Sequence, residues 1–130
     1  MEKVLLDTNF ILSCVKQKID FVSELEELFG IYELIVPAEI IGEIKKIARD
    51  KRQKLKDRQA AELALEVLKP NCIKPVSLNE KNVDKGIVNF ASKHDIIVAS
   101  LDKNLRQRIE NRNKRARFLV IKGKKRLGLL

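Results

Sequence analysis

The chain has 130 residues and a formal net charge of +9, with one histidine, two cysteines and no tryptophan. Its length suits a single domain over residues 1–130, and no apolar run approaches the roughly 20 residues that a membrane-spanning helix needs. The N-terminus leads directly into an apolar segment instead of a signal peptide, so we expect a cytoplasmic protein without membrane association.

The scarce residue types narrow the choice of metal sites. His94 is the only histidine, which excludes a histidine-rich site, and the isolated Cys14 and Cys72 lack the spacing of a zinc site. We therefore predict that both cysteines are small buried apolar residues. Any bound metal must be held by oxygen ligands, which favours Mg²⁺ or Mn²⁺ over Zn²⁺.

The first half of the chain predicts two strands and three helices. Residues 4–6 and 34–36 are apolar runs typical of buried strands. Helical spacing follows the first run, and a second helix ends at Gly30. Pro37 suits the first position of a third helix, which has isoleucines at positions 40, 41, 44 and 47. Residues 49–59 are nearly all charged or amide side chains, so we predict either a solvated helix end or a mobile linker there.

The second half continues the alternation. Residues 60–68 have a helical pattern that ends at Pro70, and Pro75 allows residues 73–76 an edge strand at best. Ser77 and Glu80 match a capping box before a helix from about residue 78 to 94. An uninterrupted apolar strand over 96–99, a short helix around residues 105–109 and a last strand over 118–121 precede a short basic C-terminal tail, about residues 122–130.

Alternating strands and helices, with strands that are apolar throughout, predict an α/β fold. We expect a three-layer sandwich in which helices flank a central parallel sheet of four to five strands. Ligands bind such sheets beyond the carboxyl ends of the strands. Asp7 and Asp102 follow two of the predicted strands and should lie at that edge.

Four acids stand out by their positions. Asp7 and Asp102 are each as well explained by helix capping as by metal binding, but Glu43 borders the apolar arc of its predicted helix. Asp84 lies within such an arc, where an isolated carboxylate would be costly without a cation, several donors or an arginine partner. Four carboxylates in one cleft need a cation, so the pattern predicts a divalent metal site. His94, on the apolar side of its helix, is predicted to be a packed core residue.

The positive charge is clustered. Residues 45–58 hold eight basic residues against Asp50 and Asp57, and residues 103–130 hold eleven against Glu110, so these stretches carry +6 and +10. Basic flanks around an acidic centre can attract a polyanion while retaining a cation. Ordinary solvated helix faces are the alternative, but the clustering favours contact with nucleic acid.

The four acids and their neighbours together resemble a PIN-domain ribonuclease, over nearly the whole chain and in the right order. The segments that carry the resemblance are Leu6-Asp7-Thr8-Asn9-Phe10, the helix with Glu43, Asp84, Val88-Asn89-Phe90-Ala91-Ser92-Lys93-His94 and Ala99-Ser100-Leu101-Asp102-Lys103-Asn104-Leu105. The long stretch from Asp7 to Ile47, and the segment 88–94 that leads into the last acidic segment, look most like the ribosome-processing branch, and toxin-type members share the acids.

The resemblance implies a function and a set of site residues. It implies an endoribonuclease that cuts single-stranded RNA with Mg²⁺ or Mn²⁺, a homodimer, and an antitoxin or a ribosomal assembly partner. The implied metal ligands and catalytic residues are Asp7, Glu43, Asp84 and Asp102, with Thr8, Asn9, Ser100 and Asn104 as supporting polar groups and Lys85, Lys103, Arg106 and Arg108 as substrate contacts. Lys85 departs from the family, where a second aspartate often follows the third acid, and it would either weaken metal binding or contact phosphate.

Two other functions compete with this one. The same fold without effective catalysis would be an RNA-binding module of a ribonucleoprotein particle. A phosphotransfer domain ranks third, because one such class needs a second aspartate where Asn9 stands and another needs paired acids early in the chain, whereas only Glu2 precedes Asp7.

Overall fold

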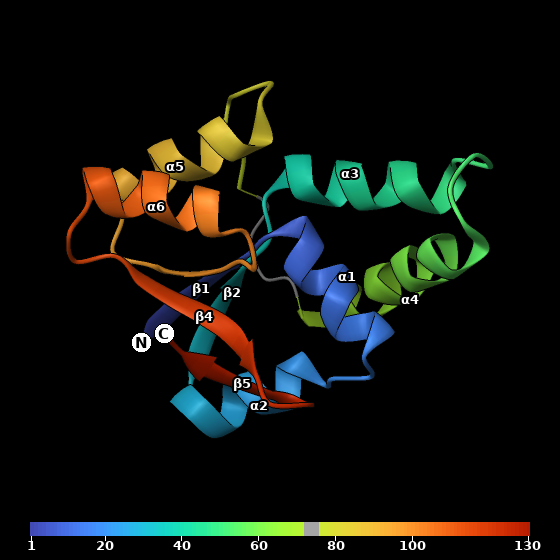
Figure 1. Cartoon of the computed structure of the whole chain (residues 1–130), viewed down its shortest axis with the longest axis horizontal. Helices are drawn as coiled ribbons and strands as arrows, with labels where there is room; N and C mark the ends of the chain where they lie inside the picture. Colours follow the sequence, from blue (N-terminus) through green and yellow to red (C-terminus); the bar gives the residue numbers. More distant parts are fainter. Residues whose placement is uncertain (72–75) are drawn as a thin grey trace.

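A five-stranded sheet forms the centre of the structure, a computed structural model that describes residues 1–71 and 76–130 (Figure 1). The spatial order of the strands is β2-β1-β3-β4-β5, and all pairs are parallel except β4 with β5. The strands are β1 (Glu2–Leu6), β2 (Tyr32–Ile35), β3 (Ile97–Ala99), β4 (Arg117–Lys122) and β5 (Arg126–Leu129).

Helices cover both faces of this sheet. In Figure 1, α5 and α6 lie together on one side of the strands and α2 lies on the other, where it contacts β2 and β5. A second group, α1 with α3 and α4, lies beyond one end of the strands. The helices are α1 (Thr8–Lys16), α2 (Phe21–Phe29), α3 (Ala38–Arg49), α4 (Leu55–Asn71), α5 (Val83–Lys93) and α6 (Lys103–Arg112). The predicted three-layer α/β fold with a central, mainly parallel sheet is confirmed.

The central strands explain why the apolar runs are uninterrupted. Val4, Leu5 and Leu6 of β1 pair with the three residues of β3, and all six are buried because helices lie on both faces. The register brings the last residues of both strands, Leu6 and Ala99, side by side. The residues that follow these two strands therefore start from the same edge of the sheet.

The C-terminal segment that we expected to be a basic tail is folded into the sheet. Gly123 has a φ of 61° in the turn after β4, and this conformation suits glycine because it has no Cβ. Arg126–Leu129 then pairs antiparallel to β4, and Leu127 is buried in the core. The four residues of β5 do not alternate between buried and exposed, since Leu127 and Gly128 are both buried, so the sequence contains no strand pattern there.

Two helix boundaries differ from the predicted ones. The charged stretch 49–59 divides between the end of α3, a turn and the first turn of α4, which starts at Leu55 and continues through Pro70 to Asn71. Burial of Ala60, Ala61, Ala64 and Leu68 stabilises α4, although its first turn is polar. The predicted edge strand at 73–76 and the predicted burial of Cys72 fall mostly or wholly outside the described residues, whereas Cys14 is buried as predicted.

The helix expected to start near residue 78 starts at Val83. Glu39 of α3 accepts hydrogen bonds from the backbone N–H groups of Leu78 and Asn79 and from the Ser77 hydroxyl (2.9–3.2 Å). These contacts hold the segment outside any helix, so Ser77 is not the cap. Asn82 is the N-cap instead, since its side chain accepts a hydrogen bond from Lys85 N–H at 3.0 Å.

His94 is exposed, so its predicted place in the core is wrong. The residue follows α5 as its C-cap, and its ring stacks on Phe90 with ring centroids 4.1 Å apart. Stacking on the helix surface satisfies the apolar side of the ring without burying it. Among the described residues, none of the helices has both the length and the apolar character needed to cross a bilayer.

Candidate active site

Asp7 and Asp102 follow the two central strands and cap the helices that come next. Asp7 Oδ1 accepts a hydrogen bond from Thr8 N–H at 2.8 Å, at the start of α1. Asp102 Oδ1 accepts hydrogen bonds from the N–H groups of Asn104 (2.9 Å) and Leu105 (3.2 Å), at the start of α6. Capping therefore fixes both carboxylates at the carboxyl edge of the sheet, where a ligand of an α/β fold is expected.

Ser100 joins these two positions. Its side chain is fully buried, and its hydroxyl donates a hydrogen bond to Asp7 Oδ2 at 3.1 Å. The same oxygen accepts a hydrogen bond from Asp102 N–H, also at 3.1 Å. A single hydroxyl thus ties the residue after β1 to the loop after β3.

Thr8 makes the corresponding link to Glu43. The Thr8 hydroxyl donates a hydrogen bond to Glu43 Oε1 at 2.7 Å, between the first turn of α1 and the middle of α3. Thr8 is buried and Glu43 is exposed. The position of Glu43 at the border of its apolar stripe thus lets the carboxylate reach the residue next to Asp7.

Asp84 is exposed, so the expectation that its carboxylate is buried is wrong. It shares a helix face with Val88 and Ala91, which are buried, but it lies in the first turn of α5. The burial of α5 begins only with Gly86, so the same face leaves the core before it reaches Asp84. The negative charge of Asp84 still acts on Asp7.

The pKa of Asp7 is raised to about 6. Burial is the main cause, since it disfavours the charged carboxylate, and the hydrogen bonds from Ser100 and Thr8 oppose it. The negative charges of Asp84 and Glu43 raise the pKa further. The hydrogen bonds from Ser100 and Thr8 therefore compensate the buried charge of Asp7 only in part.

By chemical type, the four carboxylates suit a hard divalent cation. In the part of the chain that the structure describes, Asp7, Glu43, Asp84 and Asp102 form no ion pair with a lysine, arginine or histidine. All four supply carboxylate oxygens, the ligand type that Mg²⁺ and Mn²⁺ prefer. As the side chains stand, no three acidic, histidine or cysteine residues among residues 1–71 and 76–130 are already grouped closely enough to share an ion.

A pocket of about 570 Å³ opens beside Glu43. Its walls come from α3 and from the segment before α5, and the lining residues are Glu39, Glu43, Asn79, Glu80, Lys81 and Val83. Glu39 and Lys81 were not predicted as site residues. The carboxylate of Glu39 holds the far wall through its hydrogen bonds to residues 77–79, a role that no local pattern indicates because its partners are about 40 positions away.

The remaining predicted site residues divide into two groups. Asn9, Lys85, Lys103, Asn104 and Arg108 are exposed, and the last three lie in the first two turns of α6. Arg106 is half-buried, and its Nη1 donates a hydrogen bond to the Ser100 carbonyl at 2.8 Å. Arg106 thus helps to hold the strand end in place in addition to presenting positive charge.

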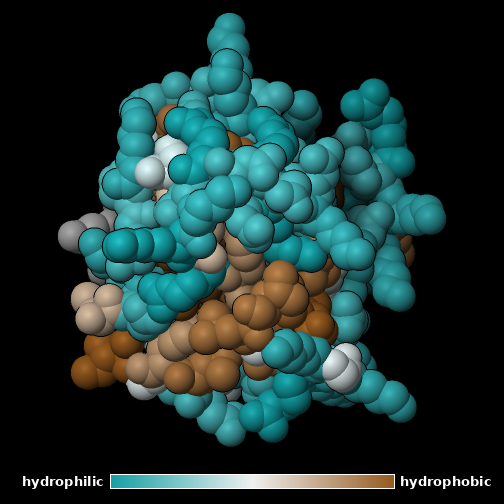
Figure 2. Space-filling model, turned by 60° about the vertical axis from the view of Figure 1, so that its left-hand side comes forward, coloured by the Kyte–Doolittle hydropathy of each residue, from teal (hydrophilic) through white to brown (hydrophobic). Residues whose placement is uncertain are grey.

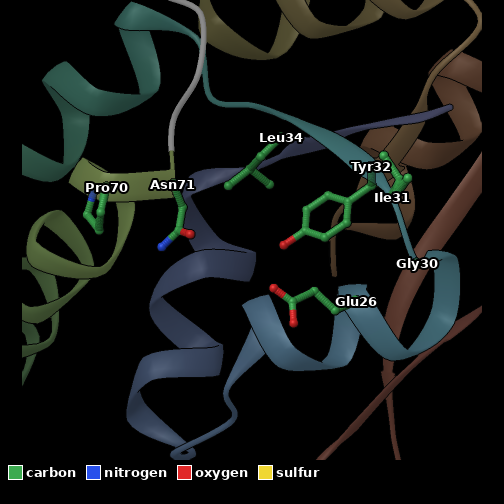
Figure 3. A pocket seen from close by; sticks show the side chains of 7 residues that line it. All are labelled: Glu26, Gly30, Ile31, Tyr32, Leu34, Pro70 and Asn71. Atoms are coloured by element: carbon green, nitrogen blue, oxygen red, sulfur yellow. The ribbon is translucent and has the colours of Figure 1, made fainter.

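A second pocket, of about 510 Å³, lies away from the acids (Figure 3). Figure 3 shows Glu26 and Tyr32 pointing toward one another, with Pro70 and Asn71 across the opening. Burial, together with the nearby charges of Glu26 and Asp20, raises the pKa of Tyr32. None of the predicted site residues lines this pocket, so it is separate from the candidate active site.

Comparisons with known proteins identify the family and support the fold. Residues 4–124 match the model of a family described as a PIN like domain. The chain is 30% identical to Ribonuclease VapC4 of Methanocaldococcus jannaschii over 115 aligned residues. The alignment covers 87% of this chain and 86% of that protein. A solved structure of the PIN domain endonuclease Utp24 aligns with a TM-score of 0.74 and 27% identity, covering 98% of this chain and 92% of the other. This protein belongs to the PIN-like domain family.

Proposed function

We propose that this protein is an endoribonuclease that hydrolyses phosphodiester bonds of single-stranded RNA and depends on Mg²⁺ or Mn²⁺. The observation that carries the proposal is the link from Asp7 to each of the other acids. Ser100 joins it to Asp102, Thr8 joins it to Glu43, and the charge of Asp84 acts on it. The relatives named as a ribonuclease and an endonuclease support the reaction class.

In this proposal Asp7, Glu43, Asp84 and Asp102 would hold the metal. A divalent ion, when bound there, would lower the pKa of a water molecule and offset charge on the scissile phosphate. The chain itself contributes orientation: Ser100 and Thr8 fix two carboxylates, and the caps of α1 and α6 fix the backbone beneath them. Asn9 and Asn104 are further polar groups at this edge.

Positive side chains on α5 and α6 would hold the RNA backbone. Lys85 follows Asp84 directly, and Lys103 and Arg108 are exposed on the helix that Asp102 caps. With few aromatic residues, the chain offers few stacking platforms, so we expect recognition of the backbone and its shape over recognition of bases. The biological role would be processing of ribosomal RNA or toxin-type RNA cleavage.

We also propose a homodimer, and an antitoxin or ribosomal partner. Figure 2 shows an apolar patch on the side of the molecule that carries both chain ends in Figure 1. Leu129 and Leu130 are 39% and 73% exposed and suit a contact, whereas Leu127 is buried within the fold and does not. Sedimentation of the purified protein, compared with a Leu129→Ser, Leu130→Ser variant, tests the dimer.

A nuclease assay tests the catalytic proposal. We expect cleavage of an unstructured RNA with Mg²⁺ or Mn²⁺ and none with a chelator. Mutation of a residue that only hydrogen-bonds to a metal ligand typically costs roughly 10- to 100-fold in activity. Asp7→Asn and Asp102→Asn replace proposed ligands themselves, so each should lower the cleavage rate by more than that. Glu62→Gln is the matched control: it removes an exposed acid on α4, outside the proposed site, and should leave the cleavage rate unchanged. RNA binding without any divalent-dependent cleavage would contradict the proposal and support the RNA-binding module.

A further inference from the structure

A groove of about 540 Å³ lies on the outer face of α3 and continues onto the turn after it. Its lining residues are Gly42, Lys45, Lys46, Arg49, Asp50 and Arg52. Gly42 adjoins Glu43 in the chain, and Arg49 lies about 9 Å further along the helix axis than Glu43, given 1.5 Å per residue. In Figure 1 α3 and α4 project together away from the sheet, so the groove leads outward from the acids along this projection.

The charge of this groove is largely uncompensated. Lys45, Lys46 and Arg49 are exposed, and within the described residues none of them forms an ion pair. Asp50 is engaged by Arg52, with Nε–Oδ1 at 3.1 Å and a second bond from Nη2 at 3.3 Å. Basic residues near a helix C-terminus also complement the helix dipole, so their charge alone does not identify a ligand.

Gly42 supplies the independent observation. It lies within α3 at the centre of the solvent-facing side, opposite the buried Ile40 and Ile44. A Cβ built at this position would meet nothing within 4 Å, so packing does not require a glycine. Glycine within a helix is less favourable than alanine, and it lets a ligand approach the backbone closely. The stripe of Gly42, the two lysines and Arg49 follows the spacing i, i+3, i+4, i+7 on one face.

We propose that this groove holds the RNA strand on one side of the cleaved bond, with Lys46 and Arg49 on successive phosphates and the bare backbone at Gly42 as the floor. The inference rests on the proposed function, because it takes Glu43 as part of the active site. It predicts that RNA must extend past the cleaved bond to bind fully. A single-stranded nucleic acid fits better than an acidic protein segment, because the groove offers charge and backbone but few apolar contacts.

The first test is binding of a fluorescent oligouridylate series of increasing length to the Asp7→Asn protein, which separates binding from cleavage. Adding Lys46→Ala and Arg49→Ala should weaken binding of the longer RNAs by about tenfold at low salt. The salt slope should fall by about 1.4, because each phosphate contact of a single strand contributes about 0.7. The shortest RNAs should bind almost unchanged.

The charge-matched control removes two exposed lysines at the other end of the sheet. Lys3 lies early in β1 and Lys93 ends α5, just before β3, and neither forms an ion pair among the described residues. Lys3→Ala with Lys93→Ala should leave both the length dependence and most of the affinity in place. Equal losses in the two double variants would show a general charge effect and overturn the proposal.

The second test replaces Gly42 and should change thermal stability and RNA affinity in opposite directions. Gly42→Ala should raise the unfolding temperature by about 4 °C, and Gly42→Gln should not lower it, while affinity for long RNA falls progressively with side-chain size. Unchanged RNA affinity in Gly42→Gln would overturn the inference even if the wild type cleaves RNA. If the wild type binds RNA through the groove but does not cleave it, only the proposed function is overturned. If the wild type does not bind RNA at all, both the proposed function and the groove are overturned.

Discussion

The Ser100 hydroxyl lies between the two acids that follow the central strands. It donates to Asp7 and accepts from the backbone of Asp102, so one small side chain satisfies a buried acceptor and a donor together. Loss of one partner of a buried hydrogen bond leaves the other unsatisfied, which costs more than the bond itself contributes. The geometry of both acids therefore depends on this residue.

Ser100→Ala should destabilise the fold by about 1–2 kcal/mol, because Asp102 N–H loses its partner. It should also raise the pKa of Asp7 above about 6, since the Ser100 hydrogen bond lowers that pKa. Thermal unfolding and a carboxyl NMR titration measure the two effects. Ser100→Thr, which retains the hydroxyl, is the control and should restore both values; an unchanged Asp7 pKa in Ser100→Ala would contradict the hydrogen-bond assignment.

Single residues were predictable where a local pattern determines their position. Asp7 and Asp102 follow apolar strands, so the sequence alone indicated the edge at which they lie. The exposure of Asp84 was not predictable, because a helical wheel gives the face of a residue but not the turn at which that face leaves the core. The role of Glu39 depends on partners distant in sequence, which no periodicity reveals.

At the scale of elements, the segment before α5 is held from two sides. Glu39 accepts hydrogen bonds from the backbone at residues 78 and 79. Burial alone would raise the pKa of Glu39, but the hydrogen bonds outweigh burial and the pKa is lowered. On the other side, Leu78 packs against Gly86, where an added Cβ would lie 2.9 Å from Leu78 Cβ. This arrangement sets the start of α5 and with it the position of Asp84.

Gly86→Ala should destabilise the protein by about 1–2 kcal/mol, because overpacking costs more than the gain in helix propensity. The added methyl group should also shift the start of α5 relative to Leu78. Divalent binding should weaken as a result, because Asp84 lies in the first turn of α5. Denaturant unfolding measures the stability. Gly42→Ala is the matched control. Gly42 also lies within a helix but has open space around it, so this substitution should stabilise the protein. A stabilised Gly86→Ala protein would show that Leu78 moves away freely.

The boundaries of elements were less predictable than their existence. Ser77 and Glu80 form a capping box in sequence, yet the Glu39 carboxylate takes the Ser77 hydroxyl and the nearby N–H groups. A tertiary contact therefore overrides the local signal and moves the helix start to Val83. The same limit applies to β5, whose short pattern is decided by pairing with β4.

Over the whole molecule, the arrangement of layers was predictable and the closeness of the acids was only partly so. Strands that are apolar throughout require cover on both faces, so the sequence alone indicates a parallel α/β sheet. The topology then places Asp7 and Asp102 at one edge because β1 and β3 are neighbours. The links through Ser100 and Thr8 depend on side-chain geometry and needed the structure.

The raised pKa of Asp7 has a consequence for global stability. Its pKa of about 6 in the folded protein exceeds the ordinary value of 3.8, so folding favours the protonated form. This contribution to stability is complete below about pH 4 and is lost as the pH rises to about 6 and beyond, by roughly 3 kcal/mol in all. Glu39, whose pKa is lowered, acts in the opposite direction and loses its contribution as the pH falls.

Asp7→Asn should therefore stabilise the metal-free protein at pH 7, by up to about 3 kcal/mol, and the difference from wild type should vanish near pH 4. Asparagine retains the helix cap, so the variant isolates the charge. Denaturant unfolding across this pH range in a chelator measures the difference. A divalent ion at 100 times its dissociation constant should then add about 2.7 kcal/mol to the wild type and much less to the variant. A pH-independent difference would show that the Asp7 carboxylate is already compensated without metal, contrary to the effect that burial and the charges of Glu43 and Asp84 have on it.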